Sequence, residues 1–88
     1  MAICHDLFVL RAMKDEQKLL EAFSTVLRLN RTKAGLSQEE LAHRAGKSIR
    51  YISLLESRKH QPSLGTLQKI CLGLGVTMTD FVAQIENL

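Results

Sequence analysis

The sequence predicts a compact, all-α domain of five helices. Three observations lead to this fold class. Apolar residues recur every three or four positions, which is the spacing of one helix face, and they rarely alternate as they do in strands. The chain of 88 residues contains a single proline. Its composition, 45% hydrophobic and 24% charged, is that of a folded globular protein, and its length suits one domain.

The first helix is expected from about residue 16 to residue 33. Asp15 is a suitable N-cap, and Glu16 would then lie in the first turn, where negative charge suits the helix dipole. Gly35 ends the helix. The apolar positions in between have helical spacing: Leu19, Leu20, Phe23, Val26 and Leu27.

Residues 1–14 are expected to form an N-terminal extension to a domain of residues 15–88. Leu7, Phe8 and Leu10 are apolar, but they follow no clear period. The pattern leaves open whether this extension frays, packs on the domain or packs on a partner.

The second helix is expected at residues 38–45. Ser37 is a suitable N-cap, and Glu40, three residues later, completes a capping box. Gly46 allows the positive φ that the turn after such a helix needs.

The third helix is expected at residues 49–57, with Ser48 as its N-cap. Ile52 and Leu55 are three residues apart and share an inward face. Two short helices joined by a tight turn that contains glycine form a helix-turn-helix, whose second helix enters the major groove of DNA.

The last two helices are expected at residues 64–74 and 78–86. Pro62-Ser63 supplies a stop followed by a cap. The expected inward residues of the fourth helix are Leu64, Leu67, Ile70, Cys71 and Leu74. The fifth helix carries its apolar residues, which include Phe81, on one stripe.

Part of that stripe exceeds what a short terminal helix needs to cover its own core, so we expect it to contact a second copy of the chain in a homodimer. The residues concerned are Met78, Val82, Ile85 and Leu88. The alternative is that Leu7, Phe8 and Leu10 of the extension supply the contact.

Positive charge is concentrated in the middle of the chain. The net charge is +3, but residues 28–59 hold eight basic and three acidic residues, a net of +5, and the remainder carries −2. A surface that binds a polyanion needs such a concentration.

A set of residues at characteristic spacing lies between about Leu27 and Phe81: Ser37-Gln38-Glu39-Glu40-Leu41-Ala42, Ala45-Gly46, Tyr51-Ile52-Ser53, Glu56, Pro62-Ser63 and Thr66-Leu67. In these residues the chain resembles the Cro and lambda-type phage repressor family, often called XRE-like. Two positions depart from the family. Lys47 follows the turn glycine where an apolar residue is usual, and Arg58 stands where glycine is usual.

The resemblance implies a lambda-repressor-like fold and a sequence-specific DNA-binding regulator of transcription. Such a regulator could be a phage repressor, an antitoxin or the controller of a restriction–modification system. The alternative is a protein-binding module of the same fold that holds a partner such as a toxin. A basic recognition face favours DNA, whereas an acidic or apolar surface on the third helix would favour a protein partner.

Side chains at the start and on the outer face of the third helix are expected to read base edges. They are Ser48, Ile49, Arg50, Ser53 and Leu54. Arg50 is the main candidate because a guanidinium pairs with two acceptors of guanine, although a phosphate contact is the alternative. Ile49 either contacts a thymine methyl or packs at the helix entry, and Leu54 either contacts a thymine methyl or joins the core.

Phosphate contacts are expected from Gln38, Lys47, Tyr51, Arg58, Lys59 and His60. For Gln38 and Tyr51 the resemblance implies this role. A half-buried structural tyrosine and a plain loop histidine are the alternatives for Tyr51 and His60. Glu56 is expected to anchor the third helix to Arg28 or Arg31.

Catalytic, metal and membrane functions are not expected. The chain holds no nucleophile elbow or glycine-rich phosphate loop. Cys4 and Cys71 lack the spacing of zinc ligands, and no cofactor is implied. Cys71 is expected to be a buried thiol and Cys4 a free one, which suits a reducing cytoplasm. We find no signal peptide and no stretch that could span a membrane.

Overall fold

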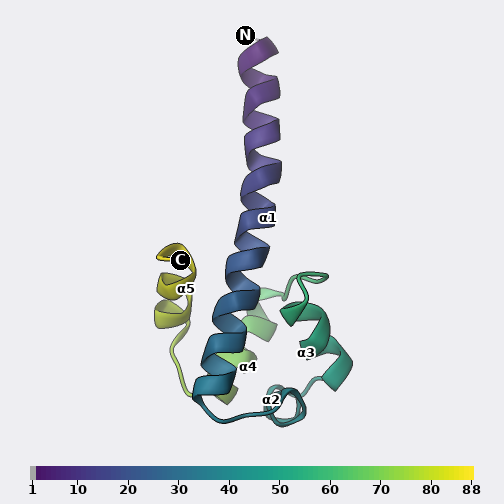
Figure 1. The fold of residues 1–88 in the computed structure, drawn as a ribbon, viewed down its shortest axis with the longest axis vertical. Helices are drawn as coiled ribbons and strands as arrows, with labels where there is room; N and C mark the ends of the chain where they lie inside the picture. Colours follow the sequence, from purple (N-terminus) through teal and green to yellow (C-terminus); the bar gives the residue numbers. More distant parts are fainter. Residues whose placement is uncertain (1) are drawn as a thin grey trace.

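The computed structural model describes the backbone of residues 2–88 and the side chains of residues 16–88. Its five helices are α1 (Ala2–Lys33), α2 (Gln38–Ala45), α3 (Ile49–Glu56), α4 (Leu64–Leu74) and α5 (Met78–Glu86). Figure 1 shows α2, α3 and α4 gathered around the C-terminal half of α1, with α5 on the other side of α1 from α3. The described backbone contains no strand, and the bounds of α2, α4 and α5 are those expected.

Helix α1 is longer than predicted. It begins at Ala2, and Asp15 lies inside the helix, so the prediction of an N-cap at Asp15 and a start near residue 16 was wrong. Residues 2–14 contain neither proline nor glycine, so nothing in them stops the helix from continuing through Asp15. Cys4, Leu7, Phe8 and Leu10 are outside the residues whose side chains the structure describes, so the expectations for these four residues stay predictions. The division into an extension and a domain stays a prediction.

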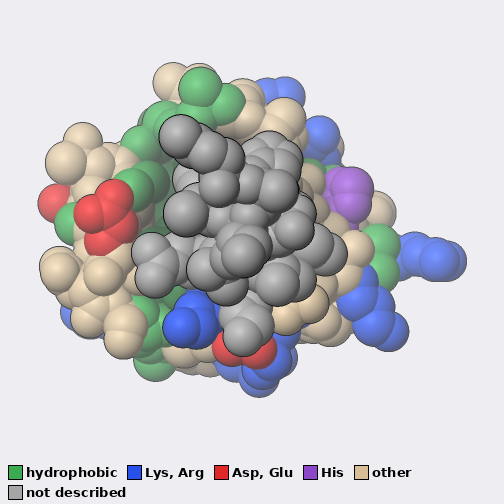
Figure 2. Space-filling model, turned by 90° about the horizontal axis from the view of Figure 1, so that it is seen from above, with side chains coloured by type: hydrophobic (Ala, Val, Ile, Leu, Met, Phe, Trp, Pro, Cys, Tyr) green, Lys and Arg blue, Asp and Glu red, His purple; other side chains and the backbone are tan. Residues whose placement is uncertain are grey.

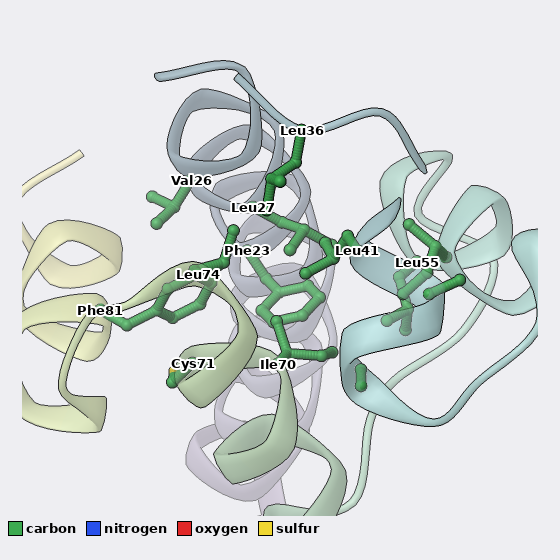
Figure 3. Packing of buried hydrophobic residues seen from close by; sticks show 13 residues of the cluster. Phe23, Val26, Leu27, Leu36, Leu41, Leu55, Ile70, Cys71, Leu74 and Phe81 are labelled. Carbon is green, nitrogen blue, oxygen red and sulfur yellow. The ribbon is translucent and has the colours of Figure 1, made fainter. Parts of the chain in front are cut away.

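The core is built from the inward faces of all five helices. Its aromatic centre is Phe23 of α1 against Phe81 of α5, with ring centroids 5.7 Å apart in an edge-to-face arrangement. Burial of each large apolar side chain stabilises the fold by about 1.5–3 kcal/mol. Figure 3 shows the cluster, whose members are Phe23, Val26, Leu27, Leu36, Leu41, Ala42, Ala45, Ile52, Leu55, Ile70, Cys71, Leu74 and Phe81.

Leu64, which was expected on the inward face of α4, is exposed instead. It is 75% exposed because it lies about 120° around α4 from the buried Ile70. Leu19, which has the helical spacing of the other apolar residues of α1, is 52% exposed, and Phe23 is the first of the described side chains of α1 in the core cluster. Leu67, also expected inward, is partly buried against the core.

Local hydrogen bonds begin and end the short helices as predicted. Ser37 Oγ accepts the N–H of Glu40, and Glu40 Oε1 accepts the N–H of Ser37, which completes the capping box. Gly46 has φ 68° and ends α2 in the left-handed conformation. Side-chain caps of this kind each stabilise a helix by about 1 kcal/mol. The other caps are Ser48, Ser63 and Thr77.

Polar contacts tie neighbouring helices together. Arg44 of α2 donates an Nη1 hydrogen bond to the Gly73 carbonyl of α4 at 3.0 Å. A side chain at Gly73 would place its Cβ 3.1 Å from that of Arg44, so glycine allows this close approach. Asn30 of α1 donates through Nδ2 to Gln84 Oε1 of α5 at 2.9 Å, which holds α5 against α1.

Candidate nucleic-acid interface

One face of α3 is buried and the other is open to solvent. Ile52 and Leu55 are fully buried, which determines the rotation of the helix about its axis. The residues predicted to read bases therefore lie on the solvent side or at the helix start. Ser48, Ile49, Arg50 and Ser53 are exposed, and Leu54 is half-buried outside the core cluster. The structure thus brings all five together on one surface.

Glu56, the last residue of α3, is the anchor that the sequence predicted. Its carboxylate is buried and accepts hydrogen bonds from both candidate arginines. Arg31 Nε lies 2.6 Å from Glu56 Oε2, and Arg28 Nε lies 3.4 Å from Glu56 Oε1. A third donor is Gln38 of α2, whose Nε2 lies 3.2 Å from Oε1. Sequence reasoning missed this contact of Gln38.

The ionisation of Glu56 follows from this arrangement. Burial opposes the charged form more strongly than any single contact favours it. The hydrogen bonds from Arg31, Gln38 and Arg28, with the positive charge of Arg31, together outweigh burial and hold the pKa of Glu56 below its ordinary value. The hydrogen bond to Glu56 raises the pKa of Arg31 in turn. The cluster is therefore a charged structural anchor.

Tyr51 is half-buried, packs against the core and contacts two other predicted site residues. The Lys47 ammonium lies 5.4 Å from the centre of its ring. The His60 ring packs edge-on against it, with centroids 5.2 Å apart. Tyr51 is therefore a half-buried structural residue, and it also lies beside two of the residues predicted to contact phosphate.

Arg58 has a left-handed backbone conformation, with φ 65°. This is the position at which the family resemblance leads one to expect glycine, which adopts such a φ without steric conflict. The Arg58 guanidinium lies 3.3 Å from a carboxylate oxygen of Glu21 on α1, and both side chains are exposed. Sequence reasoning did not identify Glu21 as a neighbour of the site. The presence of Arg58 where glycine is usual was the feature of the sequence that could have predicted a strained backbone at this position.

Basic side chains gather on the side of the molecule where α3 lies. Figure 2 shows lysine and arginine side chains and a histidine projecting there, while acidic side chains are visible on the opposite, α5 side and at the lower edge of the view, next to basic ones. Lys59 and His60 are exposed in the segment after α3. The surface around α3 is therefore suited to a polyanion.

The described residues contain no group of three or more histidine, cysteine or acidic residues that could hold a metal ion. None of the helices in this part of the chain has both the length and the apolar character to cross a membrane. Cys71 is buried, and burial raises the pKa of its thiol, which disfavours the reactive thiolate.

Comparisons with known proteins agree with this geometry. The profile of the helix-turn-helix family matches residues 27–81. A "Neisseria hypothetical transcription factor" of Neisseria meningitidis serogroup B is 36% identical over 64 residues, which cover 73% of this chain and 60% of that protein. "Control protein C.MunI" of Mycoplasma sp is 37% identical over 60 residues, which cover 68% of this chain and 81% of that protein.

Among solved structures, the restriction-modification controller protein C.Esp1396I, a tetramer in complex with its natural 35 base-pair operator, matches with a TM-score of 0.73. The two chains are 29% identical, and the match covers 78% of this chain and 91% of the controller.

Proposed function

The chain belongs to the helix-turn-helix family, in its Cro and lambda-repressor (XRE-like) branch, and we propose that it regulates transcription by binding an operator in double-stranded DNA through α3. The observation that carries this proposal is the orientation of α3. Ile52, Leu55 and Glu56 are buried on one side, so Arg50 and its neighbours face outward on a basic surface.

Base reading and phosphate contact fall to different parts of this surface. Arg50 projects from the first turn of α3, where side chains of a recognition helix reach base edges. Lys59 and His60 follow the helix and would meet the DNA backbone. Gln38 lies at the start of α2, where backbone N–H groups add to phosphate binding. Its amide is oriented by the hydrogen bond to Glu56.

A twofold homodimer through α5 would present two α3 helices about 34 Å apart, one turn of DNA. Phe81 is fully buried within the chain, and Met78 and Ile85 pack partly on the core. Val82 is 38% exposed and Leu88 66% exposed, and these two extend the apolar stripe outward. A partner copy would cover this outer part of the stripe.

Among the contexts that the resemblance implies, the restriction–modification controller has the most support, because C.Esp1396I carries that description and C.MunI is named a control protein. A phage repressor and an antitoxin remain the other contexts. A module that holds a protein partner is not favoured, since Arg50 on the outer face of α3 has basic residues in the segments on both sides of the helix, Lys47 before it and Arg58 and Lys59 after it. Regulation of an operator would take place in the cytoplasm.

The proposal is tested by selecting bound duplexes from a random DNA pool at low salt, followed by titration of the recovered sequence. A palindromic consensus is expected from a twofold dimer. If each subunit neutralises three or four phosphates, the logarithm of affinity should fall with the logarithm of salt concentration with a slope of roughly −5 to −7. Failure to retain any duplex at low salt would overturn the proposal.

A further inference from the structure

Lys47, Tyr51 and His60 come from three consecutive parts of the chain and meet at one point. Lys47 lies in the turn between α2 and α3, Tyr51 lies on α3, and His60 lies between α3 and α4. Tyr51 is the centre of the group, because Lys47 Nζ and the His60 ring each contact its ring. The Tyr51 backbone N–H is in turn bonded to Ser48 Oγ at 3.1 Å, so the ring is held by the start of the helix.

The group offers three kinds of donor to one anion. Lys47 supplies an ammonium, Tyr51 a phenol hydroxyl and His60 an imidazole that becomes a cation when protonated. A cation over the face of a tyrosine ring is stabilised by it, and the Lys47 ammonium is placed over the Tyr51 ring in this way. Charged groups donating hydrogen bonds to phosphate oxygens form the stronger kind of hydrogen bond.

DNA would bring negative charge to the surroundings of His60. In the free protein, the His60 ring packs on the Tyr51 ring, which the Lys47 ammonium also contacts. Arg58 and Lys59 precede His60 in the chain, and Arg58 is paired with Glu21 of α1. A phosphate placed next to the imidazole favours its protonated form.

We propose that Lys47, Tyr51 and His60 form a single site for a phosphodiester of the DNA backbone, and that His60 takes up a proton when DNA binds. This inference rests on the proposed function. By linkage, proton uptake on binding means that lower pH tightens binding. Affinity should therefore be highest at low pH and should fall as pH rises through the range in which imidazoles lose their proton.

The test measures affinity for a fluorescent duplex of mixed sequence at fixed ionic strength, between about pH 5.5 and pH 8.5. Wild type is expected to bind roughly tenfold tighter per subunit at the low end, the factor that one pKa unit represents. His60→Gln should bind with little pH dependence. His43→Gln is the matched control, because His43 is also exposed but lies on α2; it should behave like wild type.

Calorimetry in buffers of different ionisation heat counts the protons directly. Uptake that approaches one proton per subunit near neutral pH is expected for wild type and for His43→Gln, and none for His60→Gln. Tyr51→Leu removes the ring that joins the group and should reduce proton uptake, with circular dichroism confirming that the variant is folded.

The outcomes separate the two proposals. Wild-type pH dependence in His60→Gln overturns the role of His60, and unchanged uptake in folded Tyr51→Leu overturns the three-residue site. DNA binding that does not vary with pH overturns this inference and leaves the proposed function standing. Absence of DNA binding at every pH overturns the proposed function itself.

Discussion

Arg31 of α1 and Glu56 of α3 form an ion pair joined at two points. Arg31 Nε lies 2.6 Å from Glu56 Oε2, and Arg31 Nη2 lies 3.0 Å from Glu56 Oε1. The remaining nitrogen, Nη1, donates to the Leu36 carbonyl at 2.9 Å. One guanidinium thus connects the end of α3 to α1 and to the segment that leads into α2. Such planar, two-point pairing is specific to arginine.

Loss of the Glu56 charge should destabilise the fold strongly. Glu56→Gln keeps the shape of the side chain but leaves the mostly buried Arg31 without a counter-charge, and we expect a loss of about 3 kcal/mol in the free energy of unfolding. Urea denaturation measures it. Glu16→Gln, an exposed acid on α1, is the control and should change stability by less than about 0.5 kcal/mol. Equal losses in the two variants would contradict a role for the buried pair.

The same carboxylate should make stability depend on acid pH. The pKa of Glu56 is lowered in the folded state, below its ordinary value of 4.5. Its contribution is therefore fully present above the unfolded-state pKa and is lost as pH falls through the lowered folded-state pKa. The difference in unfolding free energy between wild type and Glu56→Gln should shrink as pH falls below 4.5. A difference that stays constant down to about pH 3 would rule out this linkage.

Arg58→Gly should stabilise the protein. The left-handed conformation at φ 65° costs a residue with a side chain about 1 kcal/mol, and glycine does not have this cost. Arg58→Ala is the matched variant, since it also loses the exposed pair with Glu21 but keeps the strain. Thermal or urea unfolding should rank Gly above Ala by about 1 kcal/mol. If the two variants are equally stable, the backbone at this position is not strained.

Arg50 and Lys59 should have separable effects on DNA binding. Arg50→Ala is expected to cost about 1–3 kcal/mol on the preferred site and to relax base preference at one position of each half-site. Lys59→Ala should weaken binding to all sequences about equally and reduce the salt slope by about one unit per subunit. Competition titrations with specific and random duplexes measure both. An equal loss on both kinds of DNA for Arg50→Ala would make Arg50 a phosphate contact.

Charge on the α5 stripe should disrupt the proposed dimer. Val82→Asp is preferable to a change at Ile85, which packs partly on the core. Sedimentation at micromolar concentration should show the variant as a monomer. Leu72→Asp is the control, because Leu72 is 74% exposed on α4, outside the stripe; it should sediment as wild type does. A Val82→Asp dimer would direct attention to the N-terminal part of α1.

The helix bounds were predictable where short-range chemistry determines them. Ser37, Glu40 and Gly46 specify the ends of α2 through contacts a few residues apart, and the structure shows those contacts. The start of α1 was not predictable in this way. Asp15 suits an N-cap, but it also fits inside a helix when the residues before it are helical. Leu64 shows a second limit of prediction from spacing. Its position fits the apolar face of α4, yet the side chain is 75% exposed, because spacing does not tell which part of that face the core covers.

The sequence predicted which side chains lie on the outer face of α3 and around it, but not the contacts that connect them. The sequence indicated that Glu56 would anchor α3, yet the choice between Arg28 and Arg31 depends on tertiary geometry, and the structure uses both. The hydrogen bond from Gln38 to the same carboxylate requires the packing of α2 on α3. The contact between Tyr51 and His60 depends on the path of the segment after α3, which no periodicity encodes.

Asn30 and Arg31 are consecutive residues of α1, yet they bind different helices. Asn30 bonds to Gln84 of α5, and Arg31 bonds to Glu56 at the end of α3. A single helical turn therefore sets the position of α3 relative to α5. In a dimer joined through α5, these two contacts of α1 would fix the distance between the two α3 helices along the DNA. One base pair added between half-sites turns one of them by about 36° and moves it by about 3.4 Å. Because α3 and α5 are both held by the same turn of α1, such a dimer would bind best at one spacing between half-sites. Its affinity would then depend on the number of base pairs between the half-sites as well as on their sequence.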